Sequence, residues 1–232
     1  MDISFILVEP KVPENLGSAA RAIKTMGFKN LSLVNPCEFN EGKARWVAHG
    51  SNDILDDAKV FNTLLDAVKE YDLVIGTTAR HRVSKSEYIE ISQLRTFLEA
   101  RRSEYNKIAI VFGKEESGLT NEQLDLCDVT STIPMAVNFP SLNLAQAVML
   151  YAFILNKNLN NEETNNDQGN NSRSLSTLKE KMEKLLEGTD ISRNKVLKGR
   201  IMERLALASV TDIKLLHSIT NSLLNKYDKA RK

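Results

Sequence analysis

The feature that most constrains the fold of this chain is an alternation of short apolar segments with longer segments of helical periodicity. Five apolar or β-branched runs have the length and flanking turn residues of buried strands; they begin at residues 3, 31, 72, 107 and 128. Helical patterns lie at residues 17–26, 62–71, 92–105 and 142–155. This alternation predicts an α/β fold with a mainly parallel sheet covered by helices on both faces. Ligands bind beyond the carboxyl ends of the strands in such sheets.

A change of composition after the last of these helices predicts a domain boundary. Half of the residues from 156 to 171 are asparagine, and the segment holds almost no apolar residue that could offset the entropy cost of ordering it. Three short amphipathic patterns follow and predict a small helical appendage, with breaks at residues 188–190 and 211–212. We therefore expect a main domain at residues 1–157, a linker at 158–173 and the appendage at 174–232.

Charge and cysteine content bound the partners of the chain. Lys and Arg number 31 against 30 Asp and Glu, so any binding of a polyanion must come from local patches. Cys37 and Cys127 lie in segments with structured patterns, which indicates reduced thiols. These cysteines and three scattered histidines lack zinc-ligand spacing, so we expect no metal site. The apolar runs are too short for a signal peptide or a membrane span, so we expect a cytoplasmic protein.

Three segments with polar residues each follow a predicted strand and contain the candidate functional residues, and the first two also contain glycine. The first, EPKVPENLGSAARAIKTMG, contains Asn15 and Arg21. Asn15 has two interpretations of similar weight, a helix cap or a member of a site. Arg21, taken alone, is more often a solvated helix arginine. This segment by itself therefore establishes no chemistry.

The second segment, VFGKEESGLTNEQL, runs from a strand into a loop with two glycines, which allow a ligand to approach the backbone closely. Thr120 and Gln123 then have the spacing of a capping box at the start of a helix. Glu115 and Glu116 could both be exposed acids, and for Glu116 that is the better interpretation.

The third segment, IPMAVNFPSLNLAQAVMLYAFIL, is a polar loop that opens a markedly apolar helix, with Ser141 and Asn143 near its start. A helix N-terminus offers free N–H groups and the positive end of a dipole, which suit a carboxylate or a phosphate. The alternative is that Ser141 is only an N-cap and that the apolar helix is core or a subunit interface.

In combination the three segments resemble a known family. The patterns N-x-G-x-x-x-R (residues 15–21), F-G-x-E-x-x-G-L (112–119) and P-S-L-N-x-A (140–145) resemble, in this order, the motifs of the SPOUT-class RNA ribose methyltransferases of the SpoU/TrmH branch. The segments NLGSAARAIKTMGF, RWVAHGSNDI, GTTAR and PSLNLAQAVM are similar to the TrmJ-like group, especially its LasT-like members. The resemblance covers residues 1–157.

The resemblance implies a fold, a cofactor and partners. Similar enzymes bury the C-terminal part of the domain as a deep trefoil knot, an exception to the rule against threaded chains. They use S-adenosylmethionine to methylate a ribose 2′-hydroxyl of RNA. In the TrmJ-like group the substrate is tRNA and the methylated ribose lies in the anticodon loop. rRNA stays open as the alternative substrate. They are homodimers in which two subunits combine to form a site. The apolar helix from Leu142 is the expected dimer face, together with part of the first helix.

The resemblance also implies roles for individual residues. Arg21 is the expected activator of the accepting hydroxyl, and because arginine stays protonated in proteins we expect electrostatic stabilisation rather than simple base catalysis. The rest of the catalytic set is Asn15, Glu115, Ser141 and Asn143. The cofactor set is Thr77, Thr78, Ala79, Arg80, Gly113, Gly118, Ile133, Met135, Ser141 and Leu142, of which Gly113, Ile133, Met135 and Leu142 are expected at the adenine. The RNA set is Lys11, Lys24, Arg45, Arg80, Arg82 and Lys85, about half of which we expect to serve only solubility.

Two functions other than RNA methylation are possible for an α/β chain of this kind. A dinucleotide-dependent oxidoreductase is disfavoured because the first strand is followed by EPKVPENLG and not by G-x-G-x-x-G. A non-catalytic RNA-binding protein on the same scaffold stays open, although the presence of the whole catalytic set favours an enzyme. Five basic residues of the appendage could add to an RNA surface, although a solvated helix face is the simpler explanation; they are Arg193, Lys195, Lys198, Arg200 and Arg204.

Overall fold

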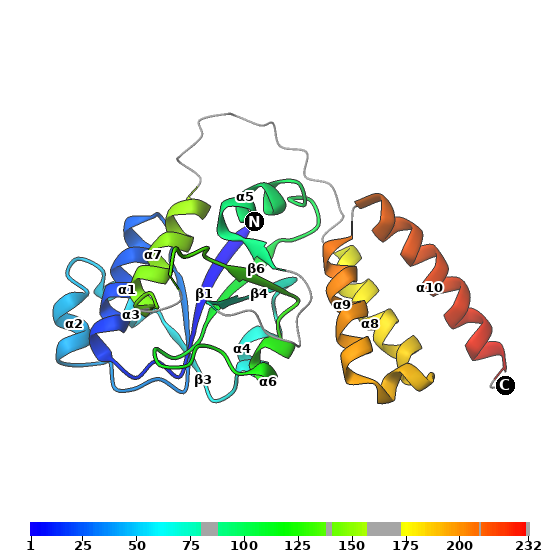
Figure 1. Ribbon diagram of the computed structural model, residues 1–232, viewed down its shortest axis with the longest axis horizontal. Helices are drawn as coiled ribbons and strands as arrows, with labels where there is room; N and C mark the ends of the chain where they lie inside the picture. Colours follow the sequence, from blue (N-terminus) through cyan, green and yellow to red (C-terminus); the bar gives the residue numbers. More distant parts are fainter. Residues whose placement is uncertain (80–87, 138–140, 157–172, 209, 231–232) are drawn as a thin grey trace.

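A seven-stranded sheet forms the centre of the molecule (Figure 1). The computed structural model describes residues 1–79, 88–137, 141–156, 173–208 and 210–230. The strand order is β3-β2-β1-β6-β4-β7-β5, and every pair of neighbours is parallel. The strands are β1 (Asp2–Val8), β2 (Asn30–Val34), β3 (Lys59–Phe61), β4 (Leu73–Thr78), β5 (Ile89–Glu90), β6 (Lys107–Phe112) and β7 (Val129–Thr132). The expected α/β class with a mainly parallel sheet is thus confirmed.

The five strands predicted from apolar runs are all present, and the two that were missed are the edge strands. β3 has three residues and β5 has two, so neither is long enough to show a periodic pattern. An edge strand has only one neighbour, which lets β3 carry the exposed residues Lys59 and Val60. A strand of this kind has no apolar run by which to recognise it.

Seven helices of the main domain are described. They are α1 (Pro13–Thr25), α2 (Lys43–Val47), α3 (Asn52–Asp56), α4 (Leu64–Val68), α5 (Ile91–Glu99), α6 (Asn121–Asp125) and α7 (Leu144–Leu155). The predicted helices correspond to α1, α4, α5 and α7, and Gly27 follows α1 with a φ of 83°, as expected of a residue just beyond a helix end. The capping box of Thr120 and Gln123 at α6 is also confirmed. The five-residue helices α2 and α3 were not predicted, because one turn and a half shows no clear period.

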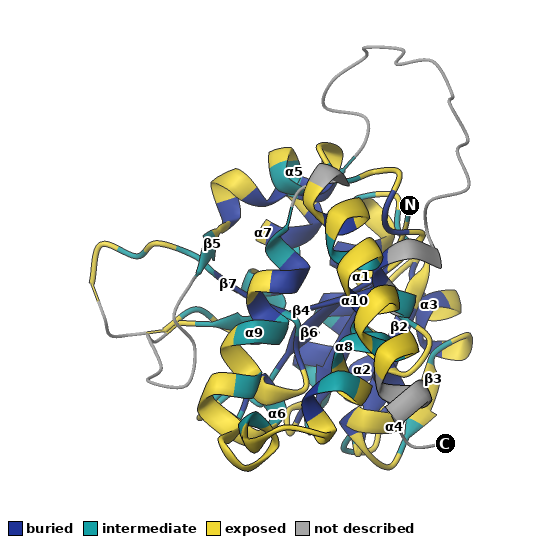
Figure 2. Ribbon diagram, turned by 90° about the vertical axis from the view of Figure 1, so that its right-hand side faces the viewer, coloured by how far each residue is buried: buried dark blue, intermediate teal, exposed yellow. Residues whose placement is uncertain are grey.

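Side chains alternate between the two faces of the sheet, and each face has its own core. Along β1, Phe5 and Leu7 join the core that contains residues of α1, α5 and α7. Ile6 and Val8 join a second core beneath α4 and α6. Figure 2 shows the buried residues concentrated in the strands, while the helices expose their outer surfaces. Complete burial of a side chain of this size stabilises the fold by about 1.5–3 kcal/mol, so both layers of helices are needed to cover the sheet.

The helices α1 and α2 are in unusually close contact. A Cβ atom at Gly17 would lie 2.0 Å from the carbonyl oxygen of Ala44 and 2.5 Å from Cγ2 of Val47. Any side chain at this position would force the two helices apart. The glycine in the middle of the first motif is therefore explained by packing, before any role in chemistry is considered.

The appendage consists of α8 (Arg173–Glu187), a short 3₁₀ helix η2 (Asp190–Arg193), α9 (Lys195–Leu207) and α10 (Val210–Ala230). The three predicted helices and the break at residues 188–190 are confirmed. The predicted break at residues 211–212 is wrong, because both residues lie in the first turn of α10. Threonine and aspartate are typical of turns and also of helix N-termini, so their presence alone does not fix the boundary.

The appendage packs against the sheet at the amino-terminal ends of β4, β6 and β7. Nζ of Lys179 on α8 lies 2.6 Å from Oδ1 of Asp128, which directly precedes β7. The hydroxyl of Tyr105, just before β6, donates to the carbonyl oxygen of Ala206 on α9 at 3.0 Å. The appendage is therefore anchored at the amino-terminal ends of these strands, opposite their carboxyl ends.

Some expectations depend on residues outside the described ranges. The path of a trefoil knot would involve residues 80–87 and 138–140, so the knot stays a prediction. The expected linker overlaps residues 157–172, and the division into domains at its ends stays a prediction too. Cys37 and Cys127 are not joined by a disulfide. No helix of the described ranges has the length and hydropathy for crossing a membrane.

The close contact at Gly17 leads to a prediction about stability. Gly17→Ala should destabilise the protein by about 1–3 kcal/mol, because the added methyl group overlaps the backbone of α2. The matched control is Gly199→Ala in α9, where nothing lies within 4 Å of the new methyl group. That control should stabilise the protein by about 0.4–1 kcal/mol, since alanine lowers the entropy of the unfolded chain. Urea unfolding of the two variants measures both signs; stabilisation by Gly17→Ala would show that the helices do not pack as described.

Candidate active site

A cavity of about 130 Å³ lies at the carboxyl ends of β4, β6 and β7, which are neighbours in the sheet. Its wall is built from the loops that follow these strands and from the start of α7. Every described member of the expected cofactor set lines it: Thr77, Thr78, Ala79, Gly113, Gly118, Ile133, Met135, Ser141 and Leu142. The remaining member, Arg80, lies outside the described residues. Segments separated by more than sixty residues in the sequence therefore meet at one place, as parallel strands require.

Sequence reasoning missed three residues of the cavity wall. They are Leu144, Ala147 and Tyr151 of α7. The three α7 residues are spaced i, i+3 and i+7, so they share one helix face, and this period was available as a signal. The hydroxyl of Tyr151 donates to Oγ of Ser131 at 3.0 Å, and burial raises the pKa of this tyrosine far above its ordinary value. Tyr151 therefore presents a neutral wall.

The loop after β6 folds back on itself, and its two glycines make this possible. A Cβ atom at Gly113 would lie 2.1 Å from the carbonyl carbon of Gly118 and 2.1 Å from the nitrogen of Leu119. Gly118 has a φ of 68°, a conformation that favours glycine. The close approach expected at these glycines is thus observed between two parts of the loop itself.

A chain of hydrogen bonds connects the three sequence motifs. Nδ2 of Asn15 on α1 donates to Oε1 of Glu115 in the loop after β6, at 2.9 Å. Nδ2 of Asn143, at the start of α7, donates to Oδ1 of Asn15 at 2.7 Å. Asn15 is 8% exposed, and its amide bridges the other two side chains. The three motifs are therefore fixed relative to one another by direct hydrogen bonds between their amide and carboxylate side chains.

Glu115 is held as a carboxylate by donors from the first motif. The backbone N–H groups of Lys11 and Val12 donate to Oε2 and Oε1 of Glu115, at 3.0 and 3.1 Å. Partial burial by itself would raise the pKa of Glu115, but the hydrogen bonds from Asn15, Lys11 and Val12 outweigh it and lower the pKa. Glu115 is therefore a structural acceptor and not the plain exposed acid of the alternative interpretation, whereas Glu116 is exposed.

The capping roles differ from those expected. Asn15 does not cap its helix, because α1 begins at Pro13 and Asn15 lies inside it. Asn143, and not Ser141, is the N-cap of α7: its Oδ1 accepts from the N–H of Ala145 at 2.8 Å. Proline is well suited to the first turn of a helix because its missing N–H is not needed there, and the N-cap position is taken by Val12. The amide of Asn15 is thereby released for the contacts across the loops.

Arg21 projects from the exposed side of α1 and is not among the described residues that line the cavity. It lines a separate open hollow between α1, α2 and α7, together with Trp46, His49 and Met149. Among the described residues no carboxylate lies within ion-pair distance of its guanidinium. The structure therefore separates the expected catalytic arginine from the cofactor cavity of its own chain.

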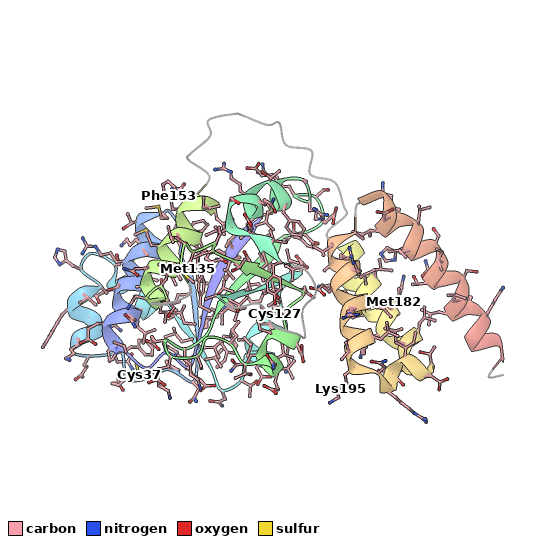
Figure 3. The ribbon with its side chains drawn as sticks, viewed as in Figure 1. Cys37, Cys127, Met135, Phe153, Met182 and Lys195 are labelled. Atoms are coloured by element: carbon pink, nitrogen blue, oxygen red, sulfur yellow. The ribbon has the colours of Figure 1, made fainter. Side chains whose placement is uncertain are left out.

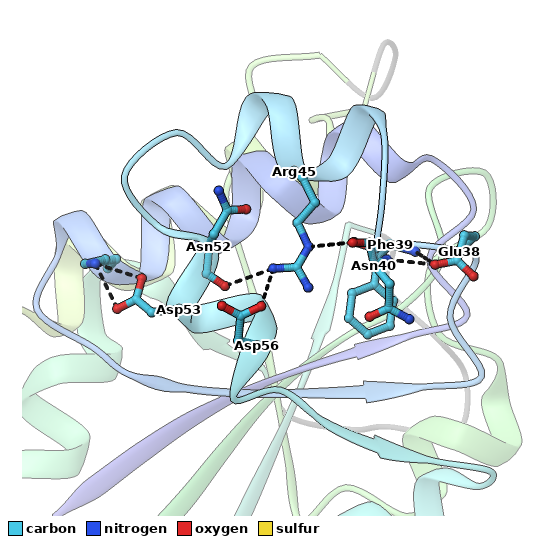
Figure 4. A network of polar contacts seen from close by, with 8 residues as sticks. Glu38, Phe39, Asn40, Arg45, Asn52, Asp53 and Asp56 are labelled. Carbon is cyan, nitrogen blue, oxygen red and sulfur yellow. Dashed lines mark hydrogen bonds and ion pairs between the residues drawn. The ribbon is translucent and has the colours of Figure 1, made fainter.

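The expected RNA contacts have different environments. Nζ of Lys24 forms an exposed ion pair with Asp53 at 2.7 Å. The guanidinium of Arg45 donates to the carbonyl oxygens of Phe39, Asn40 and Asn52 and to the carboxylate of Asp56 (Figure 4). Arg45 thus fixes α2 against its flanking loops through Nε and Nη1, which leaves fewer of its donors for a phosphate. Lys11 is exposed, and Arg80, Arg82 and Lys85 lie outside the described residues.

The environment of Glu115 predicts a pH-dependent contribution to stability. Because its pKa is lowered on folding, this contribution is complete above the ordinary carboxyl pKa of 4.5 and is lost as the pH falls through the lower folded value. Glu115→Gln should destabilise the protein by about 1–3 kcal/mol at pH 7. The difference from wild type should shrink in acid. Unfolding by urea at a series of pH values measures it, with Glu116→Gln as the exposed neighbouring control; an equal effect of the two substitutions would contradict the assigned role.

Comparison with known proteins agrees with this arrangement. Residues 2–153 match the SpoU rRNA Methylase family, and residues 172–227 match the C-terminal domain of the tRNA/rRNA methyltransferase LasT. The chain is 40% identical to an uncharacterized tRNA/rRNA methyltransferase LasT of Escherichia coli (strain K12), over 96% of this chain and 97% of the relative. It is 39% identical to the tRNA (cytidine/uridine-2'-O-)-methyltransferase TrmJ of Yersinia enterocolitica, over 66% of this chain and 59% of that protein.

Among solved structures, TrmJ from Z. mobilis ZM4 superposes with a TM-score of 0.69 and 28% sequence identity, covering 96% of this chain and 99% of the other. The similarity therefore extends through the appendage as well as the main domain. The matched family spans the three motifs, the sheet and the cavity described above. The chain belongs to the SpoU rRNA Methylase family.

Proposed function

We propose that the protein transfers a methyl group from S-adenosylmethionine to a ribose 2′-hydroxyl of RNA. The observation that carries this proposal is the convergence of three separated motifs on one cavity, where a chain of hydrogen bonds runs from Glu115 through Asn15 to Asn143. A non-catalytic RNA-binding protein would need neither a buried network of this kind nor a preformed cavity beside it. The geometry therefore favours an enzyme.

The cavity has the chemical character that S-adenosylmethionine requires. Ile133, Met135 and Leu142 supply apolar side chains suited to the faces of an adenine ring, and the folded loop at Gly113 brings backbone groups to the same wall. We assign the adenine to these four residues and the rest of the cofactor to Thr77, Thr78, Ala79, Arg80, Gly118 and Ser141. When bound, the cofactor supplies a methyl group that is already electrophilic.

The residues of the chain then have to align the ribose hydroxyl and help its proton to leave. Arg21 carries a permanent positive charge, so it can bind a neighbouring phosphate and stabilise the developing alkoxide in a preorganised way. Asn15, Glu115 and Asn143 hold the loops in place, and Ser141 at the cavity rim is suited to positioning the nucleotide. Lys11 is the described basic residue best placed to add a phosphate contact.

We further propose that the active site is completed by a second copy of the chain. Arg21 lies outside the described wall of its own cavity, so a partner's arginine is the simplest way to bring a cation to the methyl donor. An apolar surface suited to such a dimer lies on α7, where Leu150 is 38% and Phe153 is 46% exposed. Figure 3 shows Phe153 on the outer side of this helix. Burial of these side chains between two subunits would stabilise a homodimer.

The substrate that we propose is tRNA, with the anticodon loop as the target. The TrmJ relatives are named as tRNA 2′-O-methyltransferases. A solved structure whose subject is 2-OH methylation of C/U34 on tRNA superposes with a TM-score of 0.53 and 25% identity, over 66% of this chain and 93% of that one. An enzyme acting on tRNA would work in the cytoplasm. rRNA, which is in the name of the family, is the alternative substrate.

The role of Arg21 can be tested by substitution. Arg21→Ala should lower methyl transfer to tRNA by at least about 100-fold, because the loss of one preorganised charge or donor at the transition state typically has an effect of this size. Binding of S-adenosylmethionine, measured by calorimetry, should be nearly unchanged, since Arg21 does not line the cavity. Arg102→Ala, at an exposed arginine beyond α5, is the matched control for loss of surface charge. Wild-type turnover by Arg21→Ala would refute the assignment.

Mixing two inactive variants extends this test to the shared site. Leu142→Arg should block the cavity but leave Arg21 intact, while Arg21→Ala leaves the cavity intact. If each site combines a cavity with the partner's arginine, mixed dimers contain one complete site and activity should partly return. Activity that stays absent in verified mixed dimers would show that each chain uses its own arginine.

A further inference from the structure

Trp46 is the most exposed large apolar side chain in the described part of the molecule, with 76% of its surface accessible. It is also the only tryptophan of the sequence. An indole of this exposure contributes little to folding, since burial is the source of hydrophobic stabilisation. Neither the cavity nor the hydrogen-bonded network uses it. Its position therefore has no explanation in the stability of the chain.

The helix that carries Trp46 is held firmly in place. Its neighbour Arg45 donates to three carbonyl groups and one carboxylate (Figure 4). On the opposite side, Gly17 lets α1 approach α2 closely, with no space for an added side chain. Because α2 is fixed from both sides, Trp46 is presented on a rigid platform. A ligand that stacks on it would lose little free energy in ordering the protein.

Trp46 lies among both apolar and polar side chains, and the apolar ones are Ala22, Val47 and Met149. It shares an open hollow with Arg21 and His49 and with the hydroxyl residues Ser18 and Thr25. These side chains can all donate hydrogen bonds, and no carboxylate contributes to this wall. An aromatic face beside hydrogen-bond donors and a cation matches a nucleotide, whose base stacks and whose phosphate and sugar accept hydrogen bonds.

We propose that Trp46 stacks on a base of the RNA next to the methylated nucleotide, and so positions the substrate against Arg21. The proposal rests on the proposed function, because Arg21 is assigned there to the accepting ribose. Trp46 would act as a positioning residue, with no part in proton or methyl transfer. Stacking is tolerant of base identity, so Trp46 would contribute affinity for an unpaired loop more than sequence preference.

A second copy of this chain is the other occupant to consider. The apolar residues Leu150 and Phe153 give α7 the surface that a dimer needs. The hollow around Trp46 differs, since Arg21, His49, Ser18 and Thr25 lie in it beside the apolar residues Ala22, Val47 and Met149. The donors in this hollow would lose their hydrogen bonds to water if an apolar helix covered them. The observations therefore favour RNA at Trp46.

Fluorescence of the full-length protein tests the proposal directly, because the signal comes from Trp46 alone. Without RNA, the emission should be that of a solvated indole and acrylamide should quench it strongly. Addition of an in vitro transcribed tRNA, with S-adenosylhomocysteine present, should quench the emission with the same midpoint as binding measured on a filter. Unchanged emission would overturn the proposal, whether the tRNA binds or not. An indole protected from acrylamide before RNA is added would assign Trp46 to contact between subunits and would also overturn it.

Kinetics with matched variants separate stacking from catalysis. Trp46→Ala should raise KM for tRNA about 10- to 100-fold with a smaller change in kcat. Trp46→Phe should recover much of this loss because it keeps an aromatic face. Leu65→Ala, at a 53% exposed position on α4, is the control for loss of an exposed apolar side chain. Wild-type turnover combined with equal KM values for Trp46→Ala and wild type would sink this proposal alone, whereas absence of methylation by the wild-type protein would sink the proposed function.

Discussion

The arrangement of this active site depends on the hydrogen bonds that Asn15 makes in two directions. One amide, nearly buried at the start of α1, joins a carboxylate from the loop after β6 to the N-cap of α7. The loops follow different strands and are far apart in the sequence, so contacts between them fix their relative positions; the N–H groups of Lys11 and Val12 add two further hydrogen bonds to Glu115. Hydrogen bonds to a charged acceptor in a partly buried setting are stronger than those between exposed neutral groups. The position of the cavity wall follows from this connection.

The parallel sheet determines where such a connection can form. The carboxyl ends of β1, β6, β4 and β7 lie side by side, so the loops that follow them share one edge. The appendage is anchored at the opposite, amino-terminal ends of the strands through Lys179 and Tyr105. It leaves the cavity free and adds none of the described residues of its wall. The chain thus separates the region that contains the cavity from the region that matches the C-terminal domain of LasT.

Much of this fold could be predicted from the sequence, because its buried strands are wholly apolar and its main helices have a clear period. The elements that were missed are short or lie at the edge, and there local pattern carries little information. For the site, the sequence identified Asn15, Glu115 and Asn143 as members of a set but not their contacts. In the sequence, the role of a helix cap suited Asn15 as well as a role in the site. The structure excludes the cap, because α1 already begins at Pro13. Contacts between residues a hundred positions apart depend on the tertiary fold, and no local pattern contains them.

Calorimetric titration with S-adenosylmethionine, carried out on the full-length protein and on its variant Asn15→Leu, tests directly whether the hydrogen bonds of Asn15 hold the cavity wall in place. Leucine has nearly the shape of asparagine but can make neither of the two hydrogen bonds. We expect saturable binding of one cofactor molecule per chain for the wild-type protein and a large loss of affinity for the variant, with both proteins shown to be folded by circular dichroism. Absence of binding to the wild-type protein, or equal affinity of the two proteins, would contradict it.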